Sequence, residues 1–485
     1  MMEELDIATV VKRSIRGVFA LVSRTFIIQL ISLGVATFLY ALLQESEIGV
    51  FYVVSASLAF LTYFSDIGLA AALIQKKEVL TTDDLRTTFT IQQILVVLLV
   101  TIALLLSGFV GSLYHLNQEG VWLFQALVFS FFLSSLKTIP SIILERNLQF
   151  EKLVVPQILE TLAFNGVVLY CAIQGFGVMS YTYAVLARGV VGLIAIYWIA
   201  PWNIGISLTR SVAKKLLSFG IPFQSNSILA LLKDDLLVLY LGLVLPFAQV
   251  GLIGFAQKWA FTPLRLVMDN MIRITFPTFS RLAHDPMHLG KAIEKTLFAT
   301  IALVLPALTG LVILAPYFIQ FIPKYQKWEP ALLALTLFCV NAAFSSLSTP
   351  LTNALNAIGK VKITLYLMIF WTIATWGLTP LFIMLYGFNG VALASAIVGS
   401  TAFLVIILVK RHIQFNLLNV LLVPIIATVL MGIVLYWLSP FVISNLPMVF
   451  VMIVIGAIVY LGSLFAMGKK QIVADIKMIS ANLKR

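Results

Sequence analysis

Long runs of apolar residues dominate the chain, and short polar segments separate each run from the next. A helix of about 20 apolar residues is long enough to cross about 30 Å of hydrocarbon. The runs are continuous, whereas the strands of a membrane barrel alternate between apolar and polar residues. The pattern predicts about fourteen transmembrane helices, at 17–43, 48–73, 88–113, 121–144, 153–173, 178–200, 219–245, 250–276, 293–318, 331–357, 361–385, 391–409, 420–438 and 448–466.

The composition supports a membrane protein. Hydrophobic residues make up 61% of the chain and charged residues 11%, whereas a soluble domain carries about 25% charged residues. The fold class is therefore predicted to be all-α and integral to a membrane. The net charge of +12 lies mostly in loops that would face anionic lipid headgroups. We expect membrane lipids as partners and no nucleic acid.

The distribution of basic residues orients the predicted helices, because Lys and Arg concentrate in loops that stay cytoplasmic. With the N-terminus inside, Lys324 and Lys327 are the basic residues of the external loops, seven more lie within spans, and the rest of the 32 lie on the inner side. This predicts a multi-pass protein of the cytoplasmic (inner) membrane with both termini cytoplasmic. Residues 1–16 lack the features of a removable signal peptide, so the first span is expected to be permanent.

The chain divides near its middle. Residues 201–218 mix Arg210, Lys214 and Lys215 with apolar residues, which predicts an amphipathic cytoplasmic linker on the membrane surface. The predicted domains are an N-terminal lobe at 1–200, this linker at 201–218, a C-terminal lobe at 219–411, and two extra helices with a basic tail at 412–485. Six predicted helices precede the linker and eight follow it, and two lobes of six helices with two additional C-terminal helices are typical of a two-lobed transporter.

The span at 250–276 carries the densest group of intramembrane charges. Lys258, Arg265, Asp269 and Arg273 are seven, four and four residues apart, which places them on one helix stripe about 80° wide. An ionised side chain at mid-bilayer costs roughly 3 kcal/mol, so such residues usually serve a function. Either Asp269 pairs with Arg265 and Arg273, or the stripe lines a hydrated pathway.

Three consecutive charges lie in the span at 219–245. Lys233, Asp234 and Asp235 point in different directions on a continuous helix, so they cannot all face one partner. A local pair between Lys233 and an aspartate is one interpretation. The other is that at least one of the three faces a hydrated cavity.

The remaining deep charges lie in the first lobe. Arg24 and Arg188 either pair with a carboxylate or contact substrate, and Asp66 and Glu160 are the available carboxylates. Lys137 is expected to extend its amine to the cytoplasmic interface.

Cations outnumber anions within the spans, by seven to five. Such an excess in a low dielectric attracts an anionic group such as a diphosphate. The candidate substrate-binding residues are Arg24, Arg188, Lys233, Lys258, Arg265 and Arg273. The candidates for ion coupling or charge pairing are Asp66, Glu160, Asp234, Asp235 and Asp269. We identify no catalytic or metal-binding motif, because Pro286 interrupts the His284 to His288 spacing and no phosphate loop is complete.

Several short motifs resemble those of bacterial polysaccharide and O-antigen flippases, in the multidrug, oligosaccharidyl-lipid and polysaccharide (MOP) exporter superfamily. They occur in the expected order along nearly the whole chain. They are SDIGLAAALIQK at 65–76 with 81–85, ILERNLQFEKL at 143–153, FPTFSRL at 276–282 with Asp285, NALNAIGKVK at 353–362 and YGFNGVALASAI at 386–397.

The resemblance implies a two-lobed helical fold of the MOP and MATE type, with a lateral cleft flanked by helices one, two, seven and eight. It implies transport without ATP of an oligosaccharide on an isoprenoid diphosphate, by alternating access through a cationic cavity. The protein would not be an enzyme and would need no cofactor beyond a coupling proton or sodium ion. A polysaccharide polymerase and glycosyltransferases are candidate partners. The alternatives are a peptidoglycan-precursor (lipid II) flippase, a multidrug exporter and a membrane polysaccharide polymerase.

Overall fold

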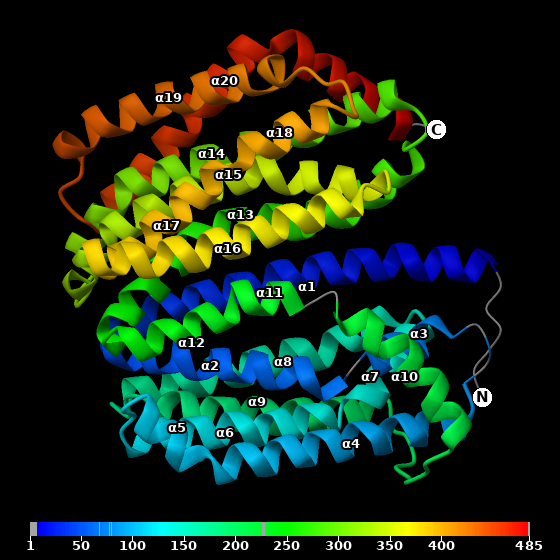
Figure 1. Ribbon diagram of the computed structural model, residues 1–485. Helices are drawn as coiled ribbons and strands as arrows, with labels where there is room; N and C mark the ends of the chain where they lie inside the picture. The colour runs from blue at the N-terminus through cyan, green and yellow to red at the C-terminus, as the bar shows by residue number, and fades with distance from the viewer. Residues whose placement is uncertain (1–6, 67, 77, 79, 226–227, 484–485) are drawn as a thin grey trace. The chain divides into compact units, whose positions relative to one another are not determined.

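The computed structural model describes the backbone of residues 7–483 except 67, 77, 79, 226 and 227 (Figure 1). Side chains are described for 23–63, 68–76, 78, 80–218, 231–418 and 420–467. Within these ranges every regular element is a helix, which confirms the predicted all-α fold class. The chain divides into two compact units, residues 1–251 and 252–485. The boundary falls inside one long helix, α13.

Unit 1 contains twelve helices and the start of α13. They are α1 (Ile7–Leu42), α2 (Glu45–Asp66), α3 (Leu69–Gln75), α4 (Thr82–Leu105), α5 (Ser107–Leu113), α6 (Gln118–Ser135), α7 (Thr138–Arg146), α8 (Phe150–Ile173), α9 (Met179–Ile199), α10 (Arg210–Ser225), α11 (Ile228–Lys233), α12 (Asp235–Val244) and α13 (Phe247–Arg281). Helix α8 packs against α1 and α9, and α9 packs against α6. The backbones of α2 and α13 approach so closely that a Cβ atom on Gly49 would lie 1.9 Å from the carbonyl oxygen of Phe247.

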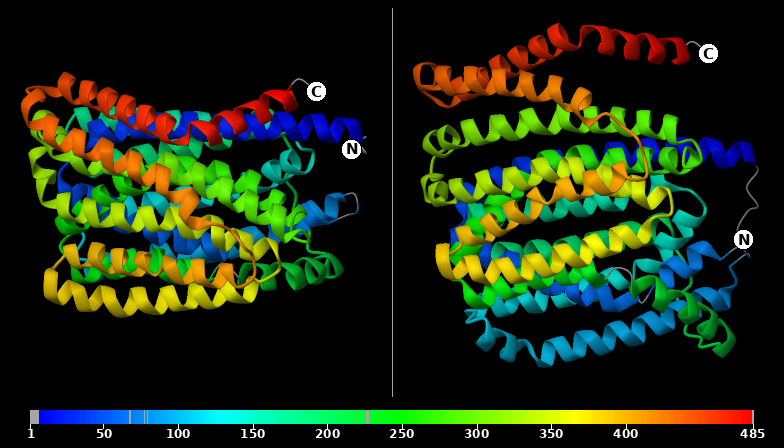
Figure 2. Two further views of the ribbon diagram at one scale, coloured as in Figure 1. Left: turned by 90° about the horizontal axis from the view of Figure 1, so that it is seen from above. Right: turned by 45° about the horizontal axis from the view of Figure 1, so that its top comes forward.

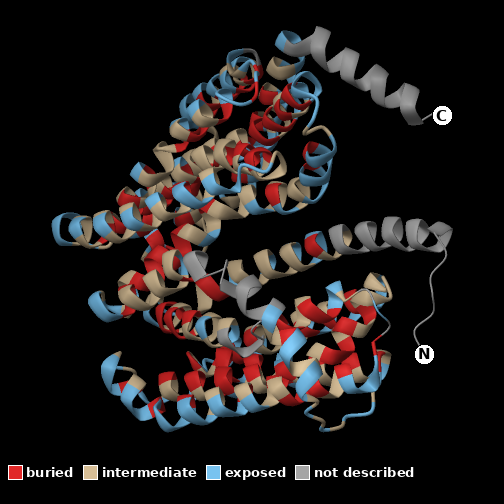
Figure 3. Cartoon of the chain, turned by 45° about the vertical axis from the view of Figure 1, so that its right-hand side comes forward, coloured by how far each residue is buried: buried red, intermediate tan, exposed pale blue. Residues whose placement is uncertain are grey.

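Unit 2 contains the rest of α13 and the C-terminal helices. They are α14 (Pro286–Phe321), the short 3-10 helix η1 (Gln326–Ala331), α15 (Leu332–Ala357), α16 (Val361–Tyr386), α17 (Asn389–Ser400), α18 (Ala402–Lys410), α19 (Leu417–Val442) and α20 (Leu446–Leu483). Helices α19 and α20 lie side by side, and α14 packs against α15 and α19 (Figure 2). Buried residues alternate with exposed ones along the helices (Figure 3), which is typical of membrane helices that bury one face in protein and expose another to lipid.

Eleven described helices or helix pairs are long and apolar enough to cross a membrane, or twelve if α6 and α7 form one span bent by 42°. They correspond to twelve of the fourteen predicted spans. The other two predicted spans fall on α10 to α12 and on α13. The expectation of one continuous helix at 219–245 is wrong, because α10 ends at Ser225 and the chain breaks again between α11 and α12. Helix α13 is long enough, but it carries the four charges of the predicted stripe.

Candidate functional site: intramembrane charges of the two units

The four charged residues of the predicted stripe on α13 all have exposed side chains: Lys258, Arg265, Asp269 and Arg273. Among the described residues Asp269 has no basic side chain within 4.0 Å, so of the two interpretations of the stripe, the one that pairs Asp269 with Arg265 and Arg273 does not hold. Stacking of Phe255 on Trp328, with ring centroids 4.7 Å apart, fixes the helix within unit 2. The stripe on α13 therefore presents three cations and one carboxylate that form no ion pair with one another.

The charged triplet in the seventh predicted span lies at a break in the helix. Lys233 ends α11 and Asp235 begins α12, so Asp234 occupies the junction. The Lys233 ammonium lies 2.7 Å from the Asp234 carboxylate, which is the local pair that the sequence left open. Asp235 takes no part in that pair. Because the helix is interrupted, the directions expected from a continuous helix do not apply here.

Glu160 on α8 is the centre of a charged cluster in unit 1. Its Oε1 atom lies 2.7 Å from the Lys137 ammonium, and its Oε2 atom lies 3.6 Å from Nε of Arg188 on α9. The side chains of Lys137 and Glu160 are only 15% and 12% exposed. The expectation that Lys137 reaches the cytoplasmic interface is wrong, because a carboxylate is available within the protein. Arg188, at 58% exposed, also has a surface open to other contacts.

Polar side chains surround the break between α6 and α7, where Lys137 lies. The Gln92 side-chain amide donates to Thr138 over 2.8 Å, and that of Gln93 donates to Ser135 over 3.1 Å. The Tyr197 hydroxyl donates over 3.1 Å to the carbonyl of Leu136, which is one of the groups that a helix break leaves without its usual partner. Side chains of α4 and α9 therefore supply hydrogen bonds to the polar groups at the bend, next to Lys137.

Arg24 on α1 contacts α8, the helix that carries Glu160, at a point one turn before Glu160. Its guanidinium donates to the side-chain carbonyl oxygen of Gln157 on α8. The carboxylate pairings considered for Arg24 involved Asp66 and Glu160. The side chain of Asp66 lies outside the described residues, and Glu160 pairs with Lys137 and Arg188 instead. The structure thus brings Arg24, Glu160 and Arg188 onto three neighbouring helices of unit 1.

A comparison with known protein families identifies the chain. Residues 38–332 match the family described as polysaccharide biosynthesis protein. The chain belongs to this family. The match covers more than half of the 485 residues, including every charged residue of the candidate site except Arg24. It confirms the resemblance drawn from the short motifs.

Curated relatives of this polysaccharide biosynthesis family member come from three bacteria. The lipopolysaccharide biosynthesis protein WzxC of Escherichia coli (strain K12) is 23% identical over 349 residues, covering 71% of this chain and 70% of WzxC. An uncharacterized membrane protein in the cps region of Klebsiella pneumoniae is 23% identical over 334 residues, covering 67% of each chain. The succinoglycan biosynthesis transport protein ExoT of Rhizobium meliloti (strain 1021) is 25% identical over 197 residues, which cover 40% of this chain and 36% of ExoT.

Solved structures of the MOP superfamily share the fold. The lipid II flippase MurJ in an inward closed conformation has a TM-score of 0.74 at 17% identity, covering 93% of this chain and 99% of MurJ. An inward-facing MATE family multidrug transporter has a TM-score of 0.62 at 17% identity, covering 79% of this chain and 95% of the transporter. These likenesses confirm the expected MOP and MATE type of fold. The family member is a multi-pass protein of the cytoplasmic membrane, as its sequence predicted.

Two of the flippase-like motifs meet in unit 1, between α3, α4 and α7. Lys76 lies 2.6 Å from Asp84, and Asp84 and Thr81 form a capping box at the start of α4. Arg146, from the second motif, donates to the carbonyl of Leu73 at the end of α3 over 2.7 Å. On the predicted topology this is the cytoplasmic side. These motif residues therefore fix helix ends and do not belong to the intramembrane cluster.

The sequence named the charged members of the unit 1 cluster but missed its neutral ones. Gln92, Gln157 and Tyr197 complete the hydrogen bonds around Lys137, Glu160 and Arg24. A further signal was present in Gly192, where a Cβ atom would lie 2.1 Å from Oε1 of Glu160. A glycine opposite a deep carboxylate on a neighbouring helix is consistent with close packing around a charge, but the contact itself needs the three-dimensional structure.

Proposed function

We propose that this protein moves an oligosaccharide carried on an isoprenoid diphosphate from the cytoplasmic to the outer leaflet, for the synthesis of a surface polysaccharide. Transport would proceed by alternating access without ATP hydrolysis. Membership of the polysaccharide biosynthesis family and the names of WzxC and ExoT support this substrate class. The protein would act with glycosyltransferases that build the unit and a polymerase that uses it.

One observation carries the proposal. Helix α13 presents Lys258, Arg265 and Arg273 on exposed side chains, and its one carboxylate in this stripe, Asp269, pairs with none of them. Exposed to hydrocarbon, these charges would each cost about 3 kcal/mol. Exposed to a hydrated cavity, they attract a diphosphate, which carries compact negative charge and accepts several hydrogen bonds. A cationic drug would instead require an excess of carboxylates.

We assign roles to the deep charges on this basis. Lys258 and Arg265 bind the diphosphate. Arg24 is the corresponding candidate within unit 1. Arg188 assists, because its guanidinium is partly exposed and contacts Glu160 only through Nε at 3.6 Å. Asp66, Asp235 and Asp269 set the local charge or carry a coupling proton or sodium ion. Glu160 holds Lys137 and Arg188 in place, and Lys233 is neutralised by Asp234.

The test is complementation of a strain that lacks its own surface-polysaccharide flippase. The Arg265→Ala variant should restore no more than a few per cent of surface polysaccharide at normal protein levels in the membrane. Arg265→Lys should retain partial export, because it keeps the positive charge but loses the planar fork of donors. Arg281→Ala is the matched control, since Arg281 is an exposed arginine at the end of the same helix and outside the predicted span.

Normal export by Arg265→Ala would refute the assigned role of this residue. Rescue of a strain lacking its peptidoglycan-precursor flippase, without rescue of the surface-polysaccharide strain, would refute the proposed substrate. The two results are distinguishable, because the first concerns one side chain and the second concerns the unmodified protein.

A further inference from the structure

A second charged site lies wholly within unit 2. A pocket of about 450 Å³ is formed by the start of α14, the end of α18 and the linker that leads to α19. On the predicted topology it lies at the cytoplasmic end of these helices. Its lining contains none of the charged residues assigned above to transport: the lining residues are Glu294, Lys410, Gln414, Phe415, Asn416 and Leu418.

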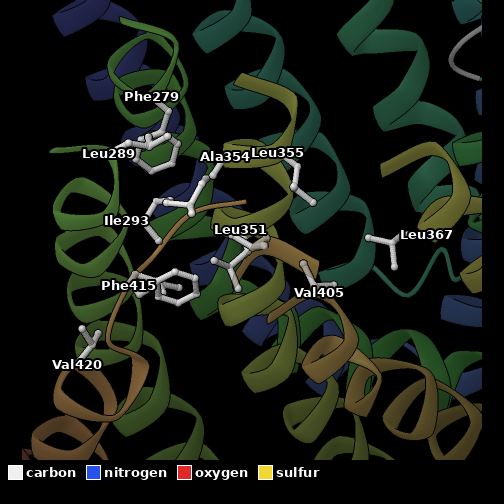
Figure 4. Packing of buried hydrophobic residues seen from close by; sticks show 13 residues of the cluster. Phe279, Leu289, Ile293, Leu351, Ala354, Leu355, Leu367, Val405, Phe415 and Val420 are labelled. Carbon is white, nitrogen blue, oxygen red and sulfur yellow. The ribbon is translucent and has the colours of Figure 1, made fainter. Parts of the chain in front are cut away.

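The linker that forms one wall is firmly packed. The backbone N–H of Asn416 donates to Oε1 of Glu294 over 2.6 Å. On the other side, a Cβ atom on Gly290 would lie 2.2 Å from the carbonyl oxygen of Gln414, so α14 and the linker touch through their backbones. Phe415 belongs to the buried hydrophobic cluster that also includes Ile293 (Figure 4). The pocket is therefore a built feature of the fold.

One basic residue lines the pocket, and two more lie close to lining residues along the chain. The Lys410 ammonium lies 5.8 Å from the ring centroid of Phe415, a cation-π contact that orders it at the pocket wall. Arg411 follows directly, and Lys291 lies one turn before Glu294 on α14; both side chains are exposed. The single carboxylate of the lining, Glu294, already accepts the Asn416 N–H bond. Among the lining residues an anion would therefore meet the Lys410 ammonium and a Glu294 carboxylate that is already engaged in a hydrogen bond.

An apolar ridge begins at the same pocket. Leu418 lines it with its side chain 75% exposed, and Leu422 and Ile425 follow at 52% and 40% exposed. Spacings of four and three residues place these side chains on one face of α19. This face runs away from the charged pocket along the length of a predicted membrane span. A ligand that suits both features has an anionic head and a hydrocarbon tail.

We propose that this pocket binds an anionic glycerophospholipid of the cytoplasmic leaflet. Its phosphodiester lies beside Lys410 and Arg411, and one acyl chain follows Leu418 and Leu422 along α19. Basic pockets at the cytoplasmic ends of membrane helices attract anionic headgroups. The site couples the end of α18 to the start of α19 through a lipid. It is separate from the proposed substrate stripe on α13.

The test is lipid binding to the full-length protein in detergent, with dioleoyl phosphatidylglycerol as the probe and native mass spectrometry as the readout. The double variant Lys410→Gln with Arg411→Gln should bind phosphatidylglycerol about thirtyfold more weakly than the unaltered protein, as expected for two lost cations near a membrane surface. The matched control changes Lys360 and Lys362 to Gln. These two exposed lysines flank the start of α16 in another loop of unit 2, and their loss should change binding less than twofold.

Three comparisons identify the ligand class. Phosphatidylcholine should bind equally to the double variant and the unaltered protein, and Leu418→Gln should weaken phosphatidylglycerol binding with the cations intact. Inorganic phosphate at millimolar concentration should not compete. Competition by phosphate alone would assign the pocket to a free anion and overturn the proposal. Equal loss of phosphatidylglycerol binding in the double variant and in the Lys360 and Lys362 control would show general electrostatic attraction and no specific binding at the pocket. That result would also overturn the proposal.

Discussion

The Lys137–Glu160 pair allows a quantitative prediction about stability. Replacing Glu160 by Gln keeps the shape of the side chain but removes the negative charge from between Lys137 and Arg188. The Lys137 side chain is 15% exposed and its ammonium lies 2.7 Å from the carboxylate, so it would remain buried without a counter-ion. Breaking a buried pair costs about 3–5 kcal/mol. Arg188 is 58% exposed and can be solvated. We therefore expect Glu160→Gln to lower the free energy of unfolding by about 3 kcal/mol, the lower end of this range.

The assay is reversible unfolding of the full-length protein in mixed micelles, with increasing denaturing detergent. Glu151→Gln is the matched control, because Glu151 is an exposed glutamate in the first turn of the same helix. It should change the free energy of unfolding by less than about 0.5 kcal/mol. A double variant with Lys137→Gln and Glu160→Gln should recover much of the loss, since no charge is then left buried. Equal stability of Glu160→Gln and Glu151→Gln would refute the reasoning.

Two further predictions concern packing within unit 1. Gly192→Ala should lower the free energy of unfolding by about 1–3 kcal/mol, because the added methyl group would overlap Glu160. The control is Gly166→Ala on α8, where a Cβ atom would meet nothing within 4 Å. This variant should show no loss in the same measurement. Arg146→Gln should remove the bond to the carbonyl of Leu73 and speed hydrogen exchange in α3, while exchange in α8 stays unchanged; equal exchange in both proteins would contradict this assignment.

The helical class and most of the spans follow directly from the sequence. A long apolar segment suits the hydrocarbon around it, and in a helix it makes all of its backbone hydrogen bonds within itself. The sequence was least accurate where charges interrupt such segments. At Lys233 to Asp235 a continuous helix was expected, but a helix break places two of the charges in a local pair. The 42° bend between α6 and α7 was also missed, although Pro140 marks it: a proline has no N–H to donate to the carbonyl of Leu136, four residues earlier.

The candidate site shows a similar limit. Spacing along one helix correctly placed the α13 residues on a common stripe, because the relation between neighbours on a helix is local. Partners on different helices cannot be read from spacing. The contacts of Glu160 with Lys137 and Arg188 join residues 23 and 28 positions apart in the chain. For the same reason, Asp269 was a plausible partner of Arg265 by spacing, yet their side chains do not meet.

The central claim is that cations of α13 recognise the diphosphate of a lipid-linked oligosaccharide during transport. The most direct measurement is movement of a fluorescent isoprenoid-diphosphate oligosaccharide across the membrane of proteoliposomes that contain the purified protein. A membrane-impermeant quencher reports this movement, because label in the inner leaflet is protected from it. The account predicts movement by the unaltered protein and by Arg281→Ala, and at least a tenfold slower rate with Arg265→Ala. Equal rates with Arg265→Ala and the unaltered protein would contradict it.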